Sequence, residues 1–141
     1  MHTVRIIPKL EVKGENLIKG IHLEGLRIVG KPEEIAFQYY KDGADELIYI
    51  DLVASLYQRE NFLNIVERTA QKVFIPLTVG GGVRSIEDTK MVLRAGADKI
   101  AINTAIINNP QLITDVANAF GSQCMVVSME VQKKNDGSYE C

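Results

Sequence analysis

Gly96-Ala97-Asp98-Lys99-Ile100-Ala101 repeats, in the order of its residue types, the earlier stretch Gly43-Ala44-Asp45-Glu46-Leu47-Ile48. In both copies a glycine and an alanine precede an aspartate, a second charged residue and the start of an apolar run. Glycine after the last turn of a helix supplies the positive φ of a C′ position, and a short apolar run predicts a buried strand. Each copy therefore predicts a helix that ends and a strand that begins, which indicates a repeated unit.

Five strand segments of this kind are predicted along the chain, with four helices between them. The strand segments are Arg5–Val12, Glu46–Asp51, Ile75–Val79, Lys99–Asn103 and Cys124–Val131. They are rich in isoleucine, valine and leucine, as parallel strands covered on both faces are. The alternation predicts successive βα units in a parallel sheet.

Two architectures accommodate such units, an open doubly wound sheet and a (β/α)₈ TIM barrel. A barrel usually takes roughly 250 residues, so 141 residues supply about half of one. We therefore expect a single domain over 1–141, the N-terminal half of a barrel and a fragment of a longer one. Segment 13–31 has no clean period and predicts a loop. The turn residues Asn135-Asp136-Gly137 predict a hairpin over 133–140.

The composition excludes several classes of protein. With 46% hydrophobic and 24% charged residues and a net charge of −2, the chain resembles an ordinary globular domain. Its longest basic cluster is Lys133-Lys134, so neither a nucleic-acid nor an anionic membrane partner is expected. Its apolar runs are far shorter than the ~20 residues of a membrane span. No secretory signal is visible, which favours the cytoplasm.

Metal and cofactor chemistry is not expected. The two histidines, His2 and His22, are not spaced as a metal site with any carboxylate. The two cysteines, Cys124 and Cys141, form no metal cluster.

A glycine run predicts a phosphate site. Gly80-Gly81-Gly82 ends the third predicted strand, where bare backbone can approach an anion. A tight strand-to-helix turn explains the glycines equally well. Asn103-Thr104 ends the neighbouring strand and offers an amide and a hydroxyl to the same place, which favours the phosphate.

Strand alternation also groups charged residues at the other end of the strands. Arg5, Glu46 and Lys99 take corresponding low positions on three strands and can form a charged layer. Solvated strand ends are the simpler explanation, and spacing alone favours them. Glu11 and Glu130, near the ends of the first and fifth strands, would oppose one another in a barrel as an acid and base pair.

Taken together, eight motifs resemble one known family. They are Arg5-Ile6-Ile7-Pro8, Lys19-Gly20, Asp45-Glu46-Leu47, Thr78-Val79-Gly80-Gly81-Gly82, Gly96-Ala97-Asp98-Lys99, Ile102-Asn103-Thr104-Ala105, Asn109-Pro110 and Phe120-Gly121-Ser122-Gln123. The family is the cyclase subunit of imidazole glycerol phosphate synthase, in histidine biosynthesis. The resemblance spans essentially the whole chain and implies the N-terminal half of a (β/α)₈ barrel.

The resemblance implies a substrate and its contacts. The family converts phosphoribulosyl-formimino aminoimidazole carboxamide ribonucleotide, which carries a phosphate at each end, to imidazole glycerol phosphate and aminoimidazole carboxamide ribotide. One phosphate is expected at Gly81, Gly82, Asn103 and Thr104. Lys19 is expected to contact substrate when its loop closes.

The resemblance also implies a glutaminase partner. In the family, ammonia from that partner enters at the barrel bottom through a ring of four charged residues, and Arg5, Glu46 and Lys99 match three of them. Asp45 and Asp98 are expected near the surface where the partner docks.

The chain departs from the family at the catalytic pair. The family uses two aspartates, whereas this chain has Glu11 and Glu130, each longer by one methylene. Two other functions stay open. One is a paralogue that amidates a surface sugar. The other is an inactive phosphate-binding half-barrel whose open sheet edges and uncovered interior face favour a homodimer that buries this face. We expect the isolated 141-residue chain to be a poor catalyst.

Overall fold

The computed structural model describes residues 3–21, 25–53 and 59–140; His2, His22 and Cys141 lie outside the described residues. Its strands are β1 (Lys9–Lys13), β2 (Asn16–Ile21), β3 (Gly25–Gly30), β4 (Leu47–Asp51), β5 (Leu77–Gly80), β6 (Lys99–Ile102), β7 (Met125–Val127), β8 (Gln132–Lys133) and β9 (Tyr139–Glu140). Its helices are α1 (Pro32–Lys41), α2 (Arg59–Ala70), α3 (Ile86–Arg94), α4 (Thr104–Asn108) and α5 (Gln111–Phe120), followed by the 3-10 turn η1 (Ser122–Cys124).

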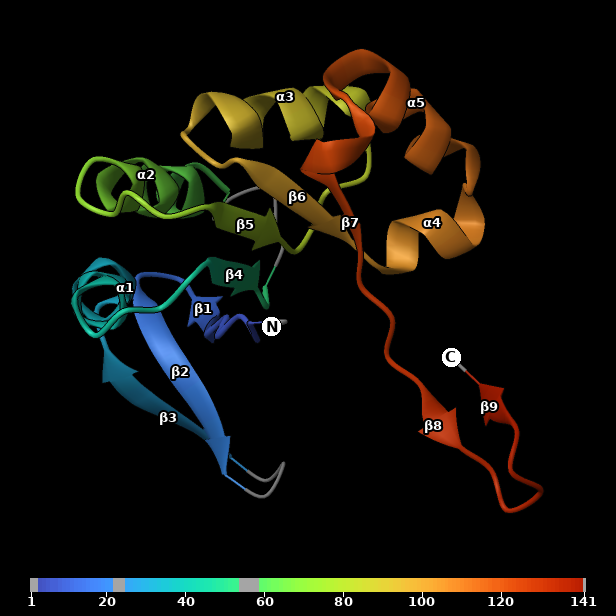
Figure 1. Cartoon of the computed structure of the whole chain (residues 1–141), viewed down its shortest axis with the longest axis horizontal. Coiled ribbons are helices and arrows are strands. Elements are labelled where there is room, and N and C mark those ends of the chain that lie inside the picture. Colours follow the sequence, from blue (N-terminus) through green and yellow to red (C-terminus); the bar gives the residue numbers. More distant parts are fainter. Residues whose placement is uncertain (1–2, 22–24, 54–58, 141) are drawn as a thin grey trace.

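Five of the strands form a parallel array in the order β1-β4-β5-β6-β7. The array is curved, and α1, α2, α3 and α5 lie along its convex side (Figure 1). Strands and helices alternate along the chain, as in the wall of a (β/α)₈ barrel. The predicted five-stranded parallel sheet and its fold class are confirmed.

The prediction of a loop over 13–31 was wrong. β2 pairs antiparallel with β1, and β3 pairs antiparallel with β2, so a hairpin extends the sheet. In β3 every residue is exposed except the half-buried Gly30. Because neither face of this strand is buried, its sequence lacks the period-2 alternation that predicts a strand.

All five predicted parallel strands are longer than the observed ones, and the first and the fifth differ most. β1 begins at Lys9 rather than Arg5, because Pro8 has no N–H to donate to a ladder. β7 ends at Val127 rather than Val131. Its final bond to the sheet runs from the Ser128 amide to the Ile102 carbonyl (2.9 Å), so Glu130 lies beyond the strand.

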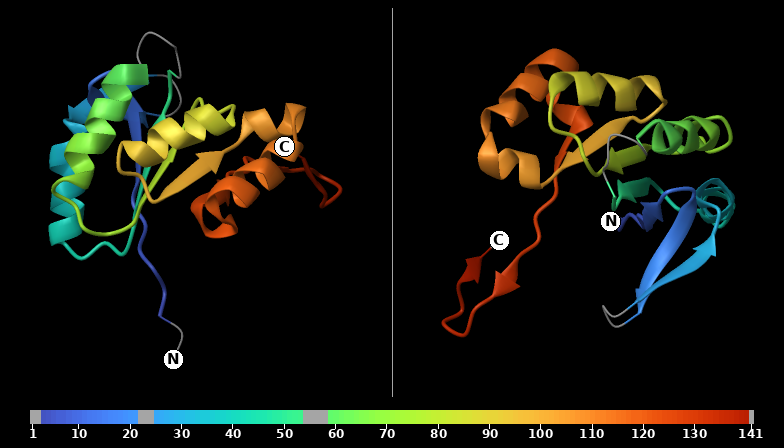
Figure 2. Two further views of the ribbon diagram at one scale, coloured as in Figure 1. Left: turned by 90° about the horizontal axis from the view of Figure 1, so that it is seen from above. Right: turned by 180° about the vertical axis from the view of Figure 1, so that it is seen from behind.

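The predicted C-terminal hairpin is confirmed. β8 and β9 pair antiparallel across the turn that contains Gly137, at φ +85°. Figure 2 shows this hairpin apart from the main sheet in both views.

The core fills the space between the parallel strands and the helices. Its largest fully buried side chain is that of Tyr49 in β4, whose hydroxyl lies 2.9 Å from the hydroxyl of Thr69 in α2. Thr69 donates its own proton to the Ile65 carbonyl (2.8 Å), so Tyr49 is the donor of the pair. Burial raises the pKa of Tyr49, which keeps the hydroxyl protonated.

Two helices begin at residues that favour a helix N-terminus. Pro32 occupies the first position of α1. The Ser85 hydroxyl caps α3 by accepting from the Asp88 amide (3.1 Å). In the part of the chain that is described, no helix is both long and apolar enough to cross a membrane.

Candidate functional site

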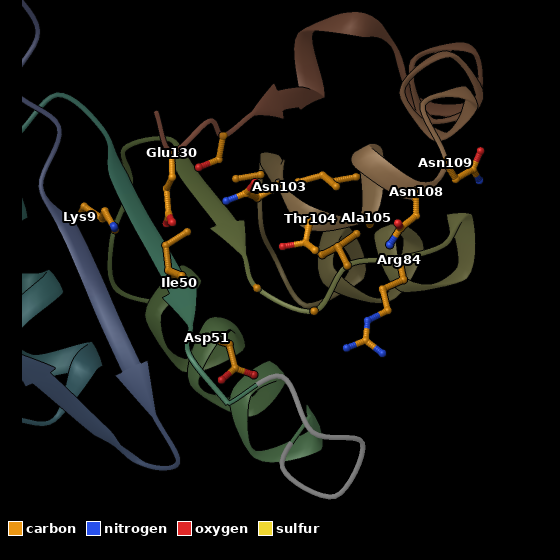
Figure 3. A pocket seen from close by; sticks show the side chains of 16 residues that line it. Lys9, Ile50, Asp51, Arg84, Asn103, Thr104, Ala105, Asn108, Asn109 and Glu130 are labelled. Carbon is orange, nitrogen blue, oxygen red and sulfur yellow. The ribbon is translucent and has the colours of Figure 1, made fainter. Parts of the chain in front are cut away.

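A cleft of about 680 Å³ opens at the carboxyl ends of the parallel strands. Its wall takes residues from the ends of β4, β5 and β6 and from the segment that follows β7. Figure 3 shows Lys9 and Glu130 on one side of it, and Asn103, Thr104 and Arg84 on the other. Loops at this end of parallel strands carry the active sites of barrel enzymes.

The glycine run after β5 forms one wall of the cleft. Gly81 and Gly82 have φ values of +94° and +68°, which residues with side chains rarely adopt. A Cβ on Gly81 would lie 2.2 Å from the Asp51 carbonyl oxygen. The glycines thus allow two strand ends to pack backbone against backbone, as the tight-turn explanation requires, and they also leave bare backbone at the cleft.

The four predicted phosphate residues are brought together. Gly81, Gly82, Asn103 and Thr104 all line the cleft. Asn103 and Gly81 follow directly after the neighbouring strands β6 and β5, whose register pairs Ala101 with Gly80. The arrangement offers amide and hydroxyl donors to one small anion, and the phosphate role stays a prediction.

The two predicted catalytic glutamates are placed differently. Glu130 lines the cleft, whereas Glu11 lies in the middle of β1 and is not among the cleft-lining residues. Lys9 also lines the cleft, and its ammonium lies 3.1 Å from a Glu11 carboxylate oxygen. The Glu11 side chain is 35% exposed, so solvent and small solutes reach it.

Lys19 lies away from this cleft. It is an exposed residue of β2, opposite Arg27 of β3. Contact with a substrate would require the β2–β3 hairpin to move, which stays a prediction.

Sequence analysis missed Asp51. It is the last residue of β4, only 7% exposed, and it lines the cleft. Its carboxylate accepts a hydrogen bond from the Val53 amide (3.0 Å). The signal was present in the sequence, because a carboxylate that ends an apolar strand takes a position that is commonly functional in barrels.

The charged layer predicted at the opposite end of the strands exists. Glu46, just before β4, accepts from Arg5 through one carboxylate oxygen and from Lys99 through the other, the latter at 2.7 Å. The side chains of Glu46 and Lys99 are 10% and 27% exposed, whereas that of Arg5 is 63% exposed. All three residues are therefore paired, and only Arg5 is also largely solvated.

Replacing Glu46 by glutamine is expected to lower the free energy of unfolding by about 1–3 kcal/mol, because the amide cannot satisfy two cations. Most of the loss should come from Lys99, since Arg5 is largely solvated. Urea denaturation measures it. Glu67→Gln, at an exposed position of α2, is the control and should change stability by less than about 0.5 kcal/mol. Equal stabilities of the two variants would contradict this prediction.

Asp45 and Asp98 make the same pair of bonds in the two repeats. The Asp45 amide donates to the Ile6 carbonyl (3.0 Å), and the Ile6 amide donates back to the Asp45 carboxylate (2.7 Å). Asp98 exchanges the corresponding bonds with Leu77, at 2.9 and 2.8 Å. Both aspartates therefore have a structural role at the strand starts, and their predicted contact with a partner stays untested.

No metal centre is found among the described residues, which contain no group of three or more histidine, cysteine, aspartate or glutamate side chains able to hold an ion.

The family model described as "Histidine biosynthesis protein" matches residues 5–140. The chain belongs to this family. It is 59% identical over 140 residues to the imidazole glycerol phosphate synthase subunit HisF of Legionella pneumophila, covering 99% of this chain and 66% of the relative. It is 51% identical to the HisF subunit of Methanocaldococcus jannaschii, and the match covers 94% of this chain and 49% of the relative. It is 50% identical to the HisF subunit of Thermobifida fusca, and the match covers 96% of this chain and 53% of the relative.

This member of the histidine biosynthesis protein family spans between about half and two thirds of the length of those relatives. The family match covers every residue of the cleft and of the charged layer.

Proposed function

We propose that the chain is part of an ammonia-dependent cyclase that converts phosphoribulosyl-formimino aminoimidazole carboxamide ribonucleotide to imidazole glycerol phosphate and aminoimidazole carboxamide ribotide. The observation that carries the proposal is the two-ended arrangement of the parallel strands. A cleft with donors for an anion lies at their carboxyl ends, and an ion-paired layer lies at their amino ends.

The carboxyl end supplies binding and proton transfer. Gly81, Gly82, Asn103 and Thr104 hold one terminal phosphate of the substrate. Glu11 acts as the general base and acid when ammonia is added and the imidazole ring closes, and Glu130 assists proton transfer from its own side of the cleft. Lys19 contacts the substrate when the β2–β3 hairpin closes.

The amino end admits ammonia. Glu46 holds Arg5 and Lys99 by opposite carboxylate oxygens, so a local movement of either cation opens a path between them. We propose that a glutaminase subunit docks on this end, close to Asp45 and Asp98, and delivers ammonia there. The cytoplasm is the compartment proposed for this pair.

We also propose that residues 1–141 form the N-terminal half of a barrel, and that the other half supplies the site for the second phosphate. The names of the relatives do not favour the sugar-amidating paralogue or the inactive half-barrel. The homodimer through open sheet edges stays a prediction.

The test is turnover of the ribonucleotide by the product of the whole reading frame. With ammonium salts at alkaline pH we expect both products in equal amounts, measured by chromatography. When the cognate glutaminase is added, glutamine should replace ammonium as the source of nitrogen. If the ribonucleotide is not consumed under either condition, the proposed function is wrong.

A further inference from the structure

Three charged residues of the cleft, Lys9, Asp51 and Arg84, have no place in the proposed function, and Arg84 is the one without a partner among the described residues. Arg84 follows the glycine run, is exposed, and lines the cleft beside Gly82 and Thr104. Among the described residues, its guanidinium makes no hydrogen bond or ion pair. Figure 3 shows it clear of the carboxylates of Asp51 and Glu130.

Asp88, the acidic residue that binds the Arg84 backbone, is already used by other groups. One oxygen of Asp88 accepts from the backbone amide of Arg84 (2.8 Å), which fixes the loop. The other oxygen forms an ion pair with Arg59 of α2 (2.8 Å), and both side chains are largely buried, at 16% and 19% exposed. Arg59 therefore neutralises Asp88, and the Arg84 guanidinium keeps its charge for a ligand.

The loop is also held in place. The Ser85 hydroxyl accepts from the Asp88 amide (3.1 Å), and the Thr89 hydroxyl donates to the Ser85 carbonyl (3.0 Å). The backbone beneath Arg84 is thus anchored at three points, including its own amide. An arginine on an ordered loop loses less conformational entropy on binding than one on a free loop.

We propose that Arg84 is a further substrate-binding residue, which binds the phosphate held by Gly81, Gly82, Asn103 and Thr104 and makes the site prefer a dianion. This rests on the proposed function and extends it. The four neighbours offer neutral donors, and Lys9, the other cation that lines the cleft, is paired with Glu11 at 3.1 Å. Arg84 therefore supplies the unpaired positive charge of the site. Its planar guanidinium matches two phosphate oxygens at once, which a lysine does not.

The test is the binding of inorganic phosphate to the protein, measured by isothermal titration calorimetry at low ionic strength. Arg84→Met is expected to raise the dissociation constant by about 10-fold or more, because a bond between two charged groups is lost. Arg84→Lys should give an intermediate value, since it keeps the charge but loses the two-pronged geometry. The control is Arg94→Met, at the other end of α3 and away from the cleft.

The outcomes separate this inference from the proposed function. If Arg84→Met binds phosphate as the unaltered protein does, or if that protein binds none, the inference is wrong. If phosphate binding depends on Arg84 while the ribonucleotide is not turned over, the inference stands and the proposed function fails. Circular dichroism of each variant checks that the fold is kept.

Discussion

Replacing Glu11 by glutamine is expected to lower ammonium-dependent kcat by about 10²-fold or more, because the amide neither accepts nor returns a proton. The loss should appear in kcat with little change in KM, since Glu11 is not among the residues that line the anion-binding cleft. Steady-state kinetics with saturating ammonium measures it. Glu34→Gln, at an exposed position of α1, is the control and should leave kcat unchanged.

The length of the side chain at position 11 provides a second variant. Glu11→Asp keeps the carboxylate but withdraws it by one methylene, and a displacement of about 1 Å can cost roughly 10²-fold in rate. If this site is built around glutamate, the aspartate variant should also be slow. Unchanged turnover in Glu11→Gln would contradict the role of Glu11 as general base and acid.

Replacing Gly81 by alanine is expected to destabilise the protein by about 2–5 kcal/mol, for two reasons that add. Its φ of +94° strains any side chain, at a cost of about 1–2 kcal/mol. The new Cβ would also meet the Asp51 carbonyl oxygen at 2.2 Å, and relieving such a clash costs roughly 1–3 kcal/mol more.

Gly43 offers a matched control. Its φ of +91° is nearly the same, but a Cβ there meets nothing within 4 Å. Gly43→Ala should therefore show the backbone cost alone, and the difference between the two variants in urea denaturation gives the cost of the clash. Equal losses would mean that the packing of Gly81 on Asp51 contributes nothing. Phosphate affinity should fall in Gly81→Ala and stay constant in Gly43→Ala.

The parallel sheet was predictable because its signals are local. The residues of β5 are all buried, and its sequence Leu-Thr-Val-Gly contains no charged residue, as in a strand covered on both faces. Gly43 and Gly96 mark helix ends by their positive φ, as predicted. The β2–β3 hairpin was not predictable in the same way, because its outer strand buries neither face and pairs only through its backbone.

The candidate site was predictable where strand ends are neighbours in sequence order. Gly81 and Asn103 follow consecutive parallel strands, so their meeting required only the topology. The position of Glu130 was harder to predict, because the point where an edge strand ends depends on hydrogen bonds to a single neighbouring strand. Spacing alone favoured an unpaired Glu46. A contact between side chains from three strands depends on their burial, which cannot be seen in a sequence.

Glu46 and Lys99 hold the same place in the two copies of the repeat, and they bind each other at 2.7 Å. Two identical copies would set carboxylate against carboxylate, or ammonium against ammonium, at this contact. The attraction therefore exists only because the copies differ at this position. If the two copies of the repeat descend from one duplicated segment, this ion pair arose after the copies diverged in sequence. It is a contact that two identical copies cannot make.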